Sequence, residues 1–391
     1  MGREEEMKIK KWSAVFMSTV MTVSLAACGG SSSNKSATTA QPSQSTDASS
    51  EQKTEIAEAS DTSATNAAST EVPSDYDWPQ MEIQVGHTNS SIETDYKQKL
   101  ATLFGDYVSE ESNGAITVTV LGDSQLGKEN ALTEGLQLGM IDMAVLSSPT
   151  FSNYDNMHLF TELPFLFQNV NAGREFVASD EYKEMNESIV DSLGIRFLTT
   201  GELGMRYVIN NVRPINAVAD MKGLKLRTPE TDIVLSIFKD LGANPTALAI
   251  SETLTAIQQG TIDGGEFPTG TIASSGFDEV TRYLSKTNHQ YTLCYLAISE
   301  QFYQGLDPEV QNLFNEAAAY AQAEQYKFID QEDAAQMKSF EEAGMQINDI
   351  SDPQQFKAAV ADVYTTYREK IGADYYDKAM SKVEACNAAN P

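Results

Sequence analysis

Short apolar stretches alternate with longer amphipathic segments from Met81 onward. Strands are predicted for MEIQVGHT, ITVTVLG and IDMAVLSS, because each is rich in apolar and β-branched residues and ends in turn formers. The segments between them, from about Glu93 to Ser112 and from about Glu129 to Leu138, have apolar residues at helical spacing. This alternation predicts a mostly parallel sheet with helices on both faces. Ligands of such sheets bind beyond the carboxyl ends of the strands, here near residues 87–89 and 147–149.

The second half of the chain repeats the alternation. Strands are predicted for GIRFLTTGELGMRYVIN, GLKLRTP, ANPTALA, IDGGEFP and YTLCYLAIS, and the last is a candidate to return to the first domain. Helices are predicted from about Glu230 to Leu241 and over SETLTAIQQG, which ends at Gly260. The chain has 391 residues, a length that favours two domains. The expected fold class is therefore α/β with two domains.

One long helix is predicted for LDPEVQNLFNEAAAYAQAEQYKFIDQEDAAQMKSFEEAG. Asp307 is placed to cap its start, Pro308 fits the first turn, and Gly344 ends it. At about 1.5 Å per residue it is long enough to contact both domains. We expect it to brace them.

The N-terminus has the pattern of an export signal. Basic residues at Lys8, Lys10 and Lys11 precede an apolar run from Ala14 to Ala27, which is too short to span a bilayer. The run ends in LAAC, which resembles the lipobox of bacterial lipoproteins and would make Cys28 the lipidated first residue of the mature protein. The alternative is an ordinary signal peptide, over residues 1–27, followed by a chance cysteine.

The residues on either side of this signal also matter. The sequence GREEE before Met7 opposes the charge pattern of a signal, so we expect translation to start at Met7. From Gly29 to about Asp77 the chain is rich in Ser, Thr, Ala, Gln and Asn, which predicts a flexible tether after the lipidated cysteine, over residues 28–78. The two other cysteines, Cys294 and Cys386, form either a disulfide or two free thiols.

Composition limits the choice of partner. The chain has 41% hydrophobic residues, enough for a sizeable core, and a formal net charge of -29. Nucleic-acid binding needs clustered Lys and Arg, so a nucleic-acid partner is not expected. An anionic small molecule would need a local positive site. No stretch after residue 28 is apolar enough to cross a membrane.

Known catalytic patterns do not occur in the sequence. The three histidines, His87, His158 and His289, are not near a Gly-x-Ser-x-Gly motif, and no metal-binding spacing or nucleotide-binding loop is present. No cofactor is therefore predicted. Asp263 and Glu266 could form an acid and base pair, as in glycosidases.

Two arginines occupy unusual places. Arg206 lies inside the apolar stretch GELGMRYVIN, and Arg227 follows GLKL where Pro229 ends the strand. A buried arginine needs a partner, because removing its charge from water costs several kcal/mol. The partner is either an internal carboxylate, among Asp220, Asp232 and Glu266, or a carboxylate on a ligand, which the planar guanidinium binds in a bidentate manner.

From Met81 to about Ala385 the chain resembles the solute-binding proteins of TRAP transporters, the tripartite ATP-independent periplasmic systems, of the DctP type. The resemblance rests on QLGKENALTEGLQLGMIDMAV, ELPFLF, ADMKGLKLRTPE, LGANPTALAISETLTAIQQGTIDGGEFP and FDEVTRYLSKTNH, which occur in the family's order. It implies a two-lobed periplasmic-binding-protein-like fold with a ligand cleft between the lobes. The expected boundaries are 79–203 plus 293–331 for lobe I and 204–292 plus 332–391 for lobe II.

The resemblance also implies roles for residues. The arginine after GLKL is the family's carboxylate clamp, so Arg227 is expected to bind the ligand carboxylate, and Arg206 matches an arginine that often supports it. Phe267 stands where many members have an asparagine, which would place a ring against the ligand and fit an acid with a less polar face. Further candidate binding residues are Glu266, Glu129, Asn130, Asn89, Ser147 and His87. The alternative for Glu266 is to orient Arg227 or Arg206 without contacting the ligand, and the alternative for His87 is an ordinary turn histidine.

The implied function is an extracytoplasmic receptor, anchored to the membrane by lipid, that delivers an organic acid to a TRAP permease. The receptor of an ABC importer or of a sensor kinase is an alternative, and a lipoprotein hydrolase that uses Asp263 and Glu266 is another. C4-dicarboxylates, hydroxy or keto acids, aromatic acids and sugar acids all remain open as ligands.

Overall fold

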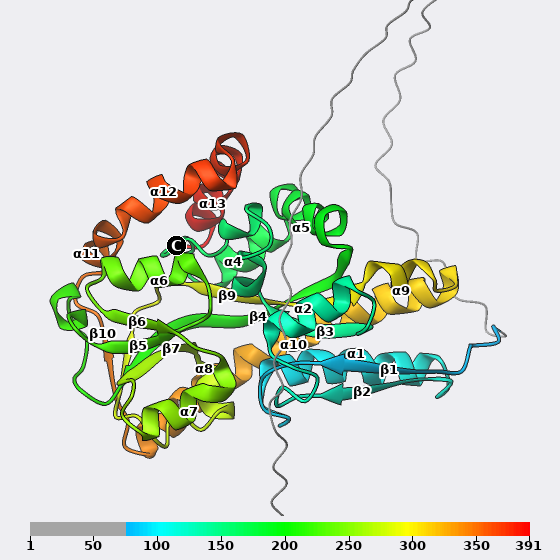
Figure 1. Ribbon diagram of the computed structural model, residues 1–391, viewed down its shortest axis with the longest axis horizontal. Coiled ribbons are helices and arrows are strands. Elements are labelled where there is room, and N and C mark those ends of the chain that lie inside the picture. The colour runs from blue at the N-terminus through cyan, green and yellow to red at the C-terminus, as the bar shows by residue number, and fades with distance from the viewer. Residues whose placement is uncertain (1–75) are drawn as a thin grey trace, which may run out of the picture. The chain divides into compact units, whose positions relative to one another are not determined.

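The structure, a computed structural model, describes residues 76–391 and builds them from alternating strands and helices (Figure 1). The strands are β1 Met81–Gly86, β2 Ile116–Leu121, β3 Met143–Ser147, β4 Ile195–Asn210, β5 Lys225–Thr228, β6 Asn244–Ala247, β7 Gly264–Pro268, β8 Tyr283–Lys286, β9 Tyr291–Ser299 and β10 Gln346–Asp349. The α-helices are α1 Tyr96–Glu111, α2 Glu129–Gln137, α3 Ser148–Phe151, α4 Val170–Val177, α5 Asp180–Leu193, α6 Asp232–Asp240, α7 Ile250–Gln258, α8 Thr269–Ser274, α9 Glu300–Gln304, α10 Pro308–Glu342, α11 Pro353–Ala359, α12 Ala361–Ile371 and α13 Ala373–Ala389. Two 3-10 helices are η1 Met157–Leu159 and η2 Val218–Met221.

The sheet has two halves that share the long strand β4. Its main hydrogen-bonded order is β2-β1-β3-β9-β4-β7-β5-β6, and β8 and β10 pair beside β4. The first part of β4, up to Met205, pairs with β9, and the part from Arg206 onward pairs with β7. We call β1, β2, β3 and β9 the first half, and β5 to β8 with β10 the second half. Arg206 therefore lies where the chain passes from one half to the other.

The prediction of a mostly parallel sheet is wrong for the centre of the sheet. Strand β1 is parallel to β2 and β3, and β5 is parallel to β6 and β7, as expected. However, β9 runs antiparallel to β3 and β4, and β4 runs antiparallel to β7 and β8. The apolar pattern of a buried strand identifies the strand but not its direction. The return of β9 to the first half is confirmed by its pairing with β3.

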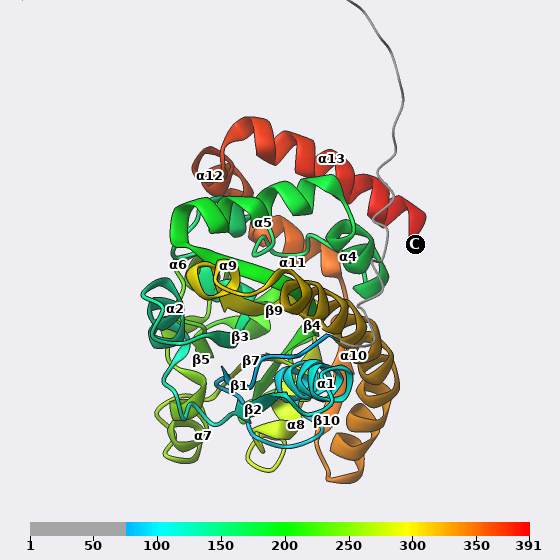
Figure 2. The same ribbon diagram turned by 90° about the vertical axis from the view of Figure 1, so that its right-hand side faces the viewer.

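The long helix is confirmed, and it contacts both halves of the sheet. Helix α10 packs against α1 in the first half and against β4 and α8 toward the second half, as Figure 2 shows along one flank of the molecule. Asp307 is the N-cap residue, Pro308 begins the helix, and Gly344 follows the C-cap with a φ of 98°. The Asp307 side chain accepts a hydrogen bond from the Tyr76 hydroxyl at 3.2 Å rather than from the helix.

Helix α1 begins later than predicted, at Tyr96 instead of Glu93. Asp95 is its N-cap residue, and Oδ1 of Asp95 accepts from the amides of Lys97 at 2.9 Å and Gln98 at 3.1 Å. Carboxylate caps of this kind satisfy helix amides that have no partner within the helix. A side-chain cap, and not the apolar spacing, therefore determines where α1 starts.

The C-terminal helices pack against a part of the chain that the expected boundaries assign to the other lobe. Helices α12 and α13 contact η1, α4 and α5. The expected lobe I contains residues 79–203 and so includes α4 and α5, whereas residues 332–391 belong to the expected lobe II. The lobe boundaries thus stay a prediction, and these helices connect the two segments.

The remaining expectations concern cysteines and the N-terminus. Cys294 and Cys386 are both buried and both free, so the described structure has two thiols and not a disulfide. The signal, the lipidated Cys28, the start at Met7 and almost all of the predicted tether lie outside the described residues. Among residues 76–391, no helix has the length and apolar character needed to cross a membrane.

Candidate ligand-binding site

A cavity of about 80 Å³ lies at the carboxyl ends of the strands, between the two halves of the sheet. It has room for several water molecules or a small organic molecule. The predicted residues that line it are Arg227, Arg206, Phe267, Glu129, Asn130, Asn89 and Ser147. The residues predicted at these strand ends therefore lie together around one cavity.

Arg227 is a nearly buried cation without a carboxylate partner among residues 76–391. Its side chain lines the cavity, it is 7% exposed, and its Nε donates to the Leu248 carbonyl at 2.8 Å. No other side-chain hydrogen bond or ion pair of Arg227 occurs in the described part of the chain. Burial lowers the pKa of Arg227 to about 10, although Glu266 acts in the opposite direction. The two terminal nitrogens of the guanidinium are thus available to a ligand.

Phe267 gives Arg227 an uncharged neighbour. Its ring lies 5.3 Å from the Arg227 Cζ and packs against Phe277 with the ring centres 4.6 Å apart. The Phe267 ring can lie here because residue 265 is a glycine. A Cβ on Gly265 would lie 2.5 Å from the Phe267 ring. A ring face attracts a cation without neutralising it. Phe267 therefore positions Arg227 and leaves its charge uncompensated.

Arg206 also lines the cavity, but Glu266 compensates its charge. The Arg206 Nη2 donates to Glu266 Oε1 at 2.8 Å and to the Glu266 carbonyl at 2.7 Å, and Nε pairs with Oε2. Of the three internal partners considered for this arginine, the structure has Glu266. The arginine is 5% exposed, and the Glu266 carboxylate is fully buried.

His289 completes this buried group. Its Nε2 lies 3.1 Å from Glu266 Oε2, and its Nδ1 lies 2.8 Å from the Thr287 hydroxyl. Burial raises the pKa of Glu266, but Arg206 and His289 outweigh burial and bring it to about 2. Burial lowers the pKa of His289, so the imidazole is neutral at pH 7 and can donate to the carboxylate. Arg206 is thus fixed in place by an ionised partner.

Glu129 organises the opposite wall of the cavity. Oε1 accepts from the hydroxyls of Thr88 and Ser147, each at 3.0 Å, and from the ammonium of Lys97. Oε2 accepts from the Ser147 amide at 3.1 Å and from the Thr150 hydroxyl at 3.0 Å. Burial raises the pKa of Glu129, but Lys97 outweighs burial and lowers the pKa below its usual value. The carboxylate is therefore ionised at neutral pH.

Comparison with known proteins assigns the chain to a family. The family model described as DctP, bacterial extracellular solute-binding protein, family 7, matches residues 85–370. The chain belongs to this family. It is a solute-binding protein of the TRAP type, and its relatives are binding proteins and not enzymes.

Three relatives illustrate the similarity. A solute-binding protein of Roseobacter denitrificans is 30% identical over 283 residues, which are 72% of this chain and 86% of the relative. The 2,3-diketo-L-gulonate-binding periplasmic protein YiaO of Escherichia coli is 29% identical over 71% of this chain and 84% of its own length. The solved sugar-acid-binding protein of Advenella mimigardefordensis in complex with galactonate is 27% identical, has a TM-score of 0.76, and aligns over 79% of this chain and all of that chain. The similarity to the Advenella structure supports the two-lobed fold.

Two of the predicted site residues do not line the cavity of this family member. Glu266 lies behind Arg206, as described above. His87 is 1% exposed and its Nε2 lies 2.8 Å from the Gln98 side chain, so it packs in the interior near the turn. Burial lowers the pKa of His87. The sequence predicted both residues near the site, but it could not show whether a side chain lines the cavity or lies behind the residues that do.

The sequence reasoning missed several residues of the site. Lys97, Thr88 and Thr150 surround Glu129, and Asn153 lines the cavity and donates to the Glu230 carbonyl at 2.9 Å across it. Lys97 is only 1% exposed. Its position on the inner face of α1 was a signal, since a buried lysine requires a partner. The hydroxyl residues gave no such signal, because Ser and Thr also occur in ordinary turns.

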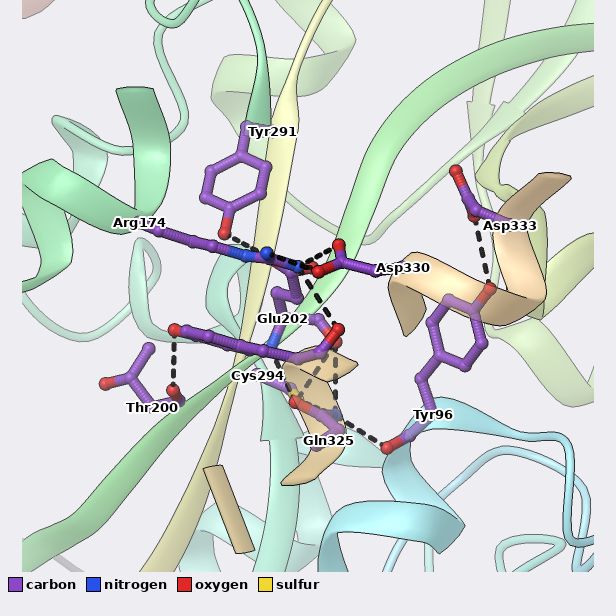
Figure 3. A network of polar contacts seen from close by, with 10 residues as sticks. Tyr96, Arg174, Thr200, Glu202, Tyr291, Cys294, Gln325, Asp330 and Asp333 are labelled. Carbon is purple, nitrogen blue, oxygen red and sulfur yellow. Dashed lines mark hydrogen bonds and ion pairs between the residues drawn. The ribbon is translucent and has the colours of Figure 1, made fainter. Parts of the chain in front are cut away.

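A second polar network holds β4 just before Arg206 (Figure 3). Arg174 on α4 donates to Glu202 on β4 at 3.0 Å and to Asp330 on α10 at 2.8 Å, and Gln325 on α10 accepts from the Glu202 amide at 3.0 Å. A register shift in β4 lies between Glu202 and Gly204. These contacts fix the irregular part of β4 against α4 and α10, and so fix the strand that carries Arg206.

Proposed function

We propose that the protein captures an organic acid in this cavity, binds its carboxylate with Arg227, and delivers it to the membrane subunits of a TRAP-type secondary transporter. The observation that carries the proposal is the uncompensated charge of Arg227 at the cavity surface. Arginine presents a planar set of donors that matches a carboxylate, which explains why the partner would be an acid and not a neutral solute.

The arginine alone does not account for useful affinity. A charge-assisted contact contributes about 1.5–3 kcal/mol, and micromolar binding needs about 8 kcal/mol. Contacts from both halves of the sheet would supply the remainder when they exclude water from the ligand. Several polar contacts already cross the cavity, including the one between Asn153 and the Glu230 carbonyl and the ion pair between Lys128 and Glu252 at 2.8 Å.

Similarity to proteins that are named for sugar acids, or were solved with them, suggests a sugar acid as the ligand. The Advenella protein was solved with galactonate and the Roseobacter protein with L-galactonate, and the Escherichia coli relative is named for 2,3-diketo-L-gulonate. Polar cavity walls and the single uncompensated arginine support such a ligand here. The Phe267 ring would contact the less polar carbon face of the acid.

The proposed location follows from the N-terminal sequence. Lipid attached to Cys28 would anchor the protein to the outer face of the cell membrane, and residues 29–77 would act as the tether. A tethered receptor would stay close to its permease, which raises the effective concentration of one at the other.

A direct test is mass spectrometry of small molecules released by denaturing the purified protein. We expect a carboxylic acid in about equimolar amount, released intact. Arg227→Ala and Arg227→Lys should both bind this acid weakly, because lysine keeps the charge but loses the bidentate geometry. Undiminished affinity in both variants would refute the role of Arg227. Chemical turnover of the bound molecule would instead favour a hydrolase.

A further inference from the structure

We call Glu129 with Thr88, Ser147 and Thr150 the Glu129 wall. The hydroxyl groups of this wall donate their protons to Glu129 and not toward the cavity. Thr88, Ser147 and Thr150 each donate to Glu129 at 3.0 Å, and Ser124 donates to the Thr88 carbonyl at 3.4 Å. All four residues line the cavity. A hydroxyl has one proton and two acceptor lone pairs. Once the proton is committed, the group can only accept a hydrogen bond from a ligand.

Glu129 enforces this orientation. An ionised carboxylate is acceptor-only, so each hydroxyl that contacts it must donate. Lys97 keeps Glu129 ionised and also donates to the Thr88 hydroxyl at 3.2 Å. Glu129 itself has five donors in contact and little capacity left for a ligand.

The charges around the cavity also differ between the wall at Arg227 and the wall at Glu129. Arg206 is paired with Glu266 and Lys128 with Glu252, whereas Arg227 has no acidic partner among residues 76–391. The side chain of Glu230 adds a negative charge at the cavity wall. The described site therefore matches one carboxylate at Arg227 and groups that donate hydrogen bonds at the opposite wall.

We infer that the Glu129 wall selects polyhydroxylated monocarboxylic acids and rejects the corresponding dicarboxylic acids. This inference rests on the proposed binding of a carboxylate by Arg227. A terminal hydroxyl of the ligand would donate to the lone pairs of Thr88, Ser147 or Thr150. A second carboxylate in the same place would find the protons of these three hydroxyls already donated to Glu129. The hydroxyls could not replace its lost hydration, which is costly for a charged group. Specificity of this kind arises from a repulsive element as well as an attractive one.

Calorimetry with matched acids tests the inference. The pairs are D-gluconate and D-glucarate, L-galactonate and galactarate, and D-erythronate and meso-tartrate, in which only the terminal CH₂OH becomes a carboxylate. For the pair that contains the tightest binder, we expect the monoacid to bind at least about tenfold more tightly. Thr150→Val should weaken the monoacid more than the diacid and so reduce this ratio. Thr150→Ser retains a hydroxyl and should largely preserve the ratio. Thr119→Val is the control, because it makes the same change as Thr150→Val at an exposed position of β2.

The outcomes separate this inference from the proposed function. A diacid that binds as tightly as its monoacid, with both lost in Arg227→Ala, overturns the inference and leaves carboxylate capture intact. A ratio that Thr150→Val does not change, or that Thr119→Val changes equally, also overturns it. Failure of all six acids to bind would overturn the inference alone, because the proposed function admits other organic acids. Binding that Arg227→Ala does not affect would contradict both proposals.

Discussion

Arg206 and Arg227 lie on either side of β7, and they differ in how their charges are compensated. Both line the cavity and both are less than 10% exposed, at 5% and 7%. Consecutive residues of β7 make the difference: Glu266 forms an ion pair with Arg206, and the Phe267 ring lies against Arg227. Burial of an arginine therefore does not by itself identify a ligand contact. Arg227 is the candidate for a ligand contact because, among the described residues, it forms no ion pair.

This contrast predicts opposite responses to substitution. Removing one partner of a compensated pair leaves a buried charge behind, whereas removing an uncompensated charge relieves the folded protein of it. The first change affects stability, and the second affects ligand binding.

Arg206→Met should have the largest effect. It leaves Glu266 buried without its cation, so we expect the free energy of unfolding to fall by about 3–5 kcal/mol. Denaturant titration of the ligand-free protein measures this loss. The double variant Arg206→Met with Glu266→Gln should recover part of it, because the two side chains interact directly. A loss below about 1 kcal/mol would show that the pair is not essential for stability.

Glu162 extends the comparison to carboxylates. It is fully buried with Ser148 and Gln290 as hydrogen-bond partners, and burial raises its pKa to about 7. The folded protein then retains a proton that the unfolded chain loses above pH 4.5, the usual value. Stability should therefore fall as pH rises from about 4.5 to 7, in contrast to Glu266, whose contribution is lost only as pH falls toward 2.

Glu162→Gln should remove this dependence. At pH 8 the variant should be more stable than the parent by an amount on the order of 3 kcal/mol, and at pH 4.5 the two should be nearly equal. Denaturant titrations at several pH values provide the measurement. A pH slope that persists in the variant would assign the titration to another group.

Arg227→Met should show the reverse of Arg206→Met. Ligand affinity should fall by about 10- to 100-fold, which corresponds to the loss of about 1.5–3 kcal/mol, because no other described cation can replace the guanidinium. The stability of the ligand-free protein should not fall, because no carboxylate loses its partner. Calorimetry and denaturant titration of the same preparation check both parts. A large loss of stability would mean that Arg227 has an internal structural role.

The sequence predicted which residues gather around the cavity better than it predicted the contacts between them. The strand ends at Asn89, Ser147 and Arg227 could be identified because apolar stretches end there in polar residues, and the structure brings all three to one cavity. The direction of β4 and β9 could not be predicted, since it depends on pairing between distant segments. The interaction of Lys97 with Glu129 could not be predicted either, because it joins two helices 32 positions apart in sequence.

The same limit explains the two arginines. Local sequence showed that Arg206 and Arg227 are charges in apolar surroundings but left three internal partners open. Only the register of β4 against β7, with Val208 opposite Glu266 and Arg206 opposite Pro268, brings the Glu266 carboxylate to Arg206. A change of register by one residue would reverse which side chains share a face. Strand pairing thus determines which of the two arginines forms the internal ion pair.

The ion pair between Lys128 and Glu252 should have the smallest effect and sets the lower end of the comparison. It joins α7 to the residue before α2 across the cavity, at 2.8 Å, with the two side chains 52% and 49% exposed. Exposed pairs contribute little and are screened by salt. Glu252→Gln should therefore raise the dissociation rate of the bound acid by no more than about threefold at low salt, and by less at 0.5 M NaCl. Stopped-flow measurements at both salt concentrations test this. A change of tenfold or more that salt does not reduce would mean that the exposed pair, and not the buried contacts of Arg227, holds the two sides of the cavity together.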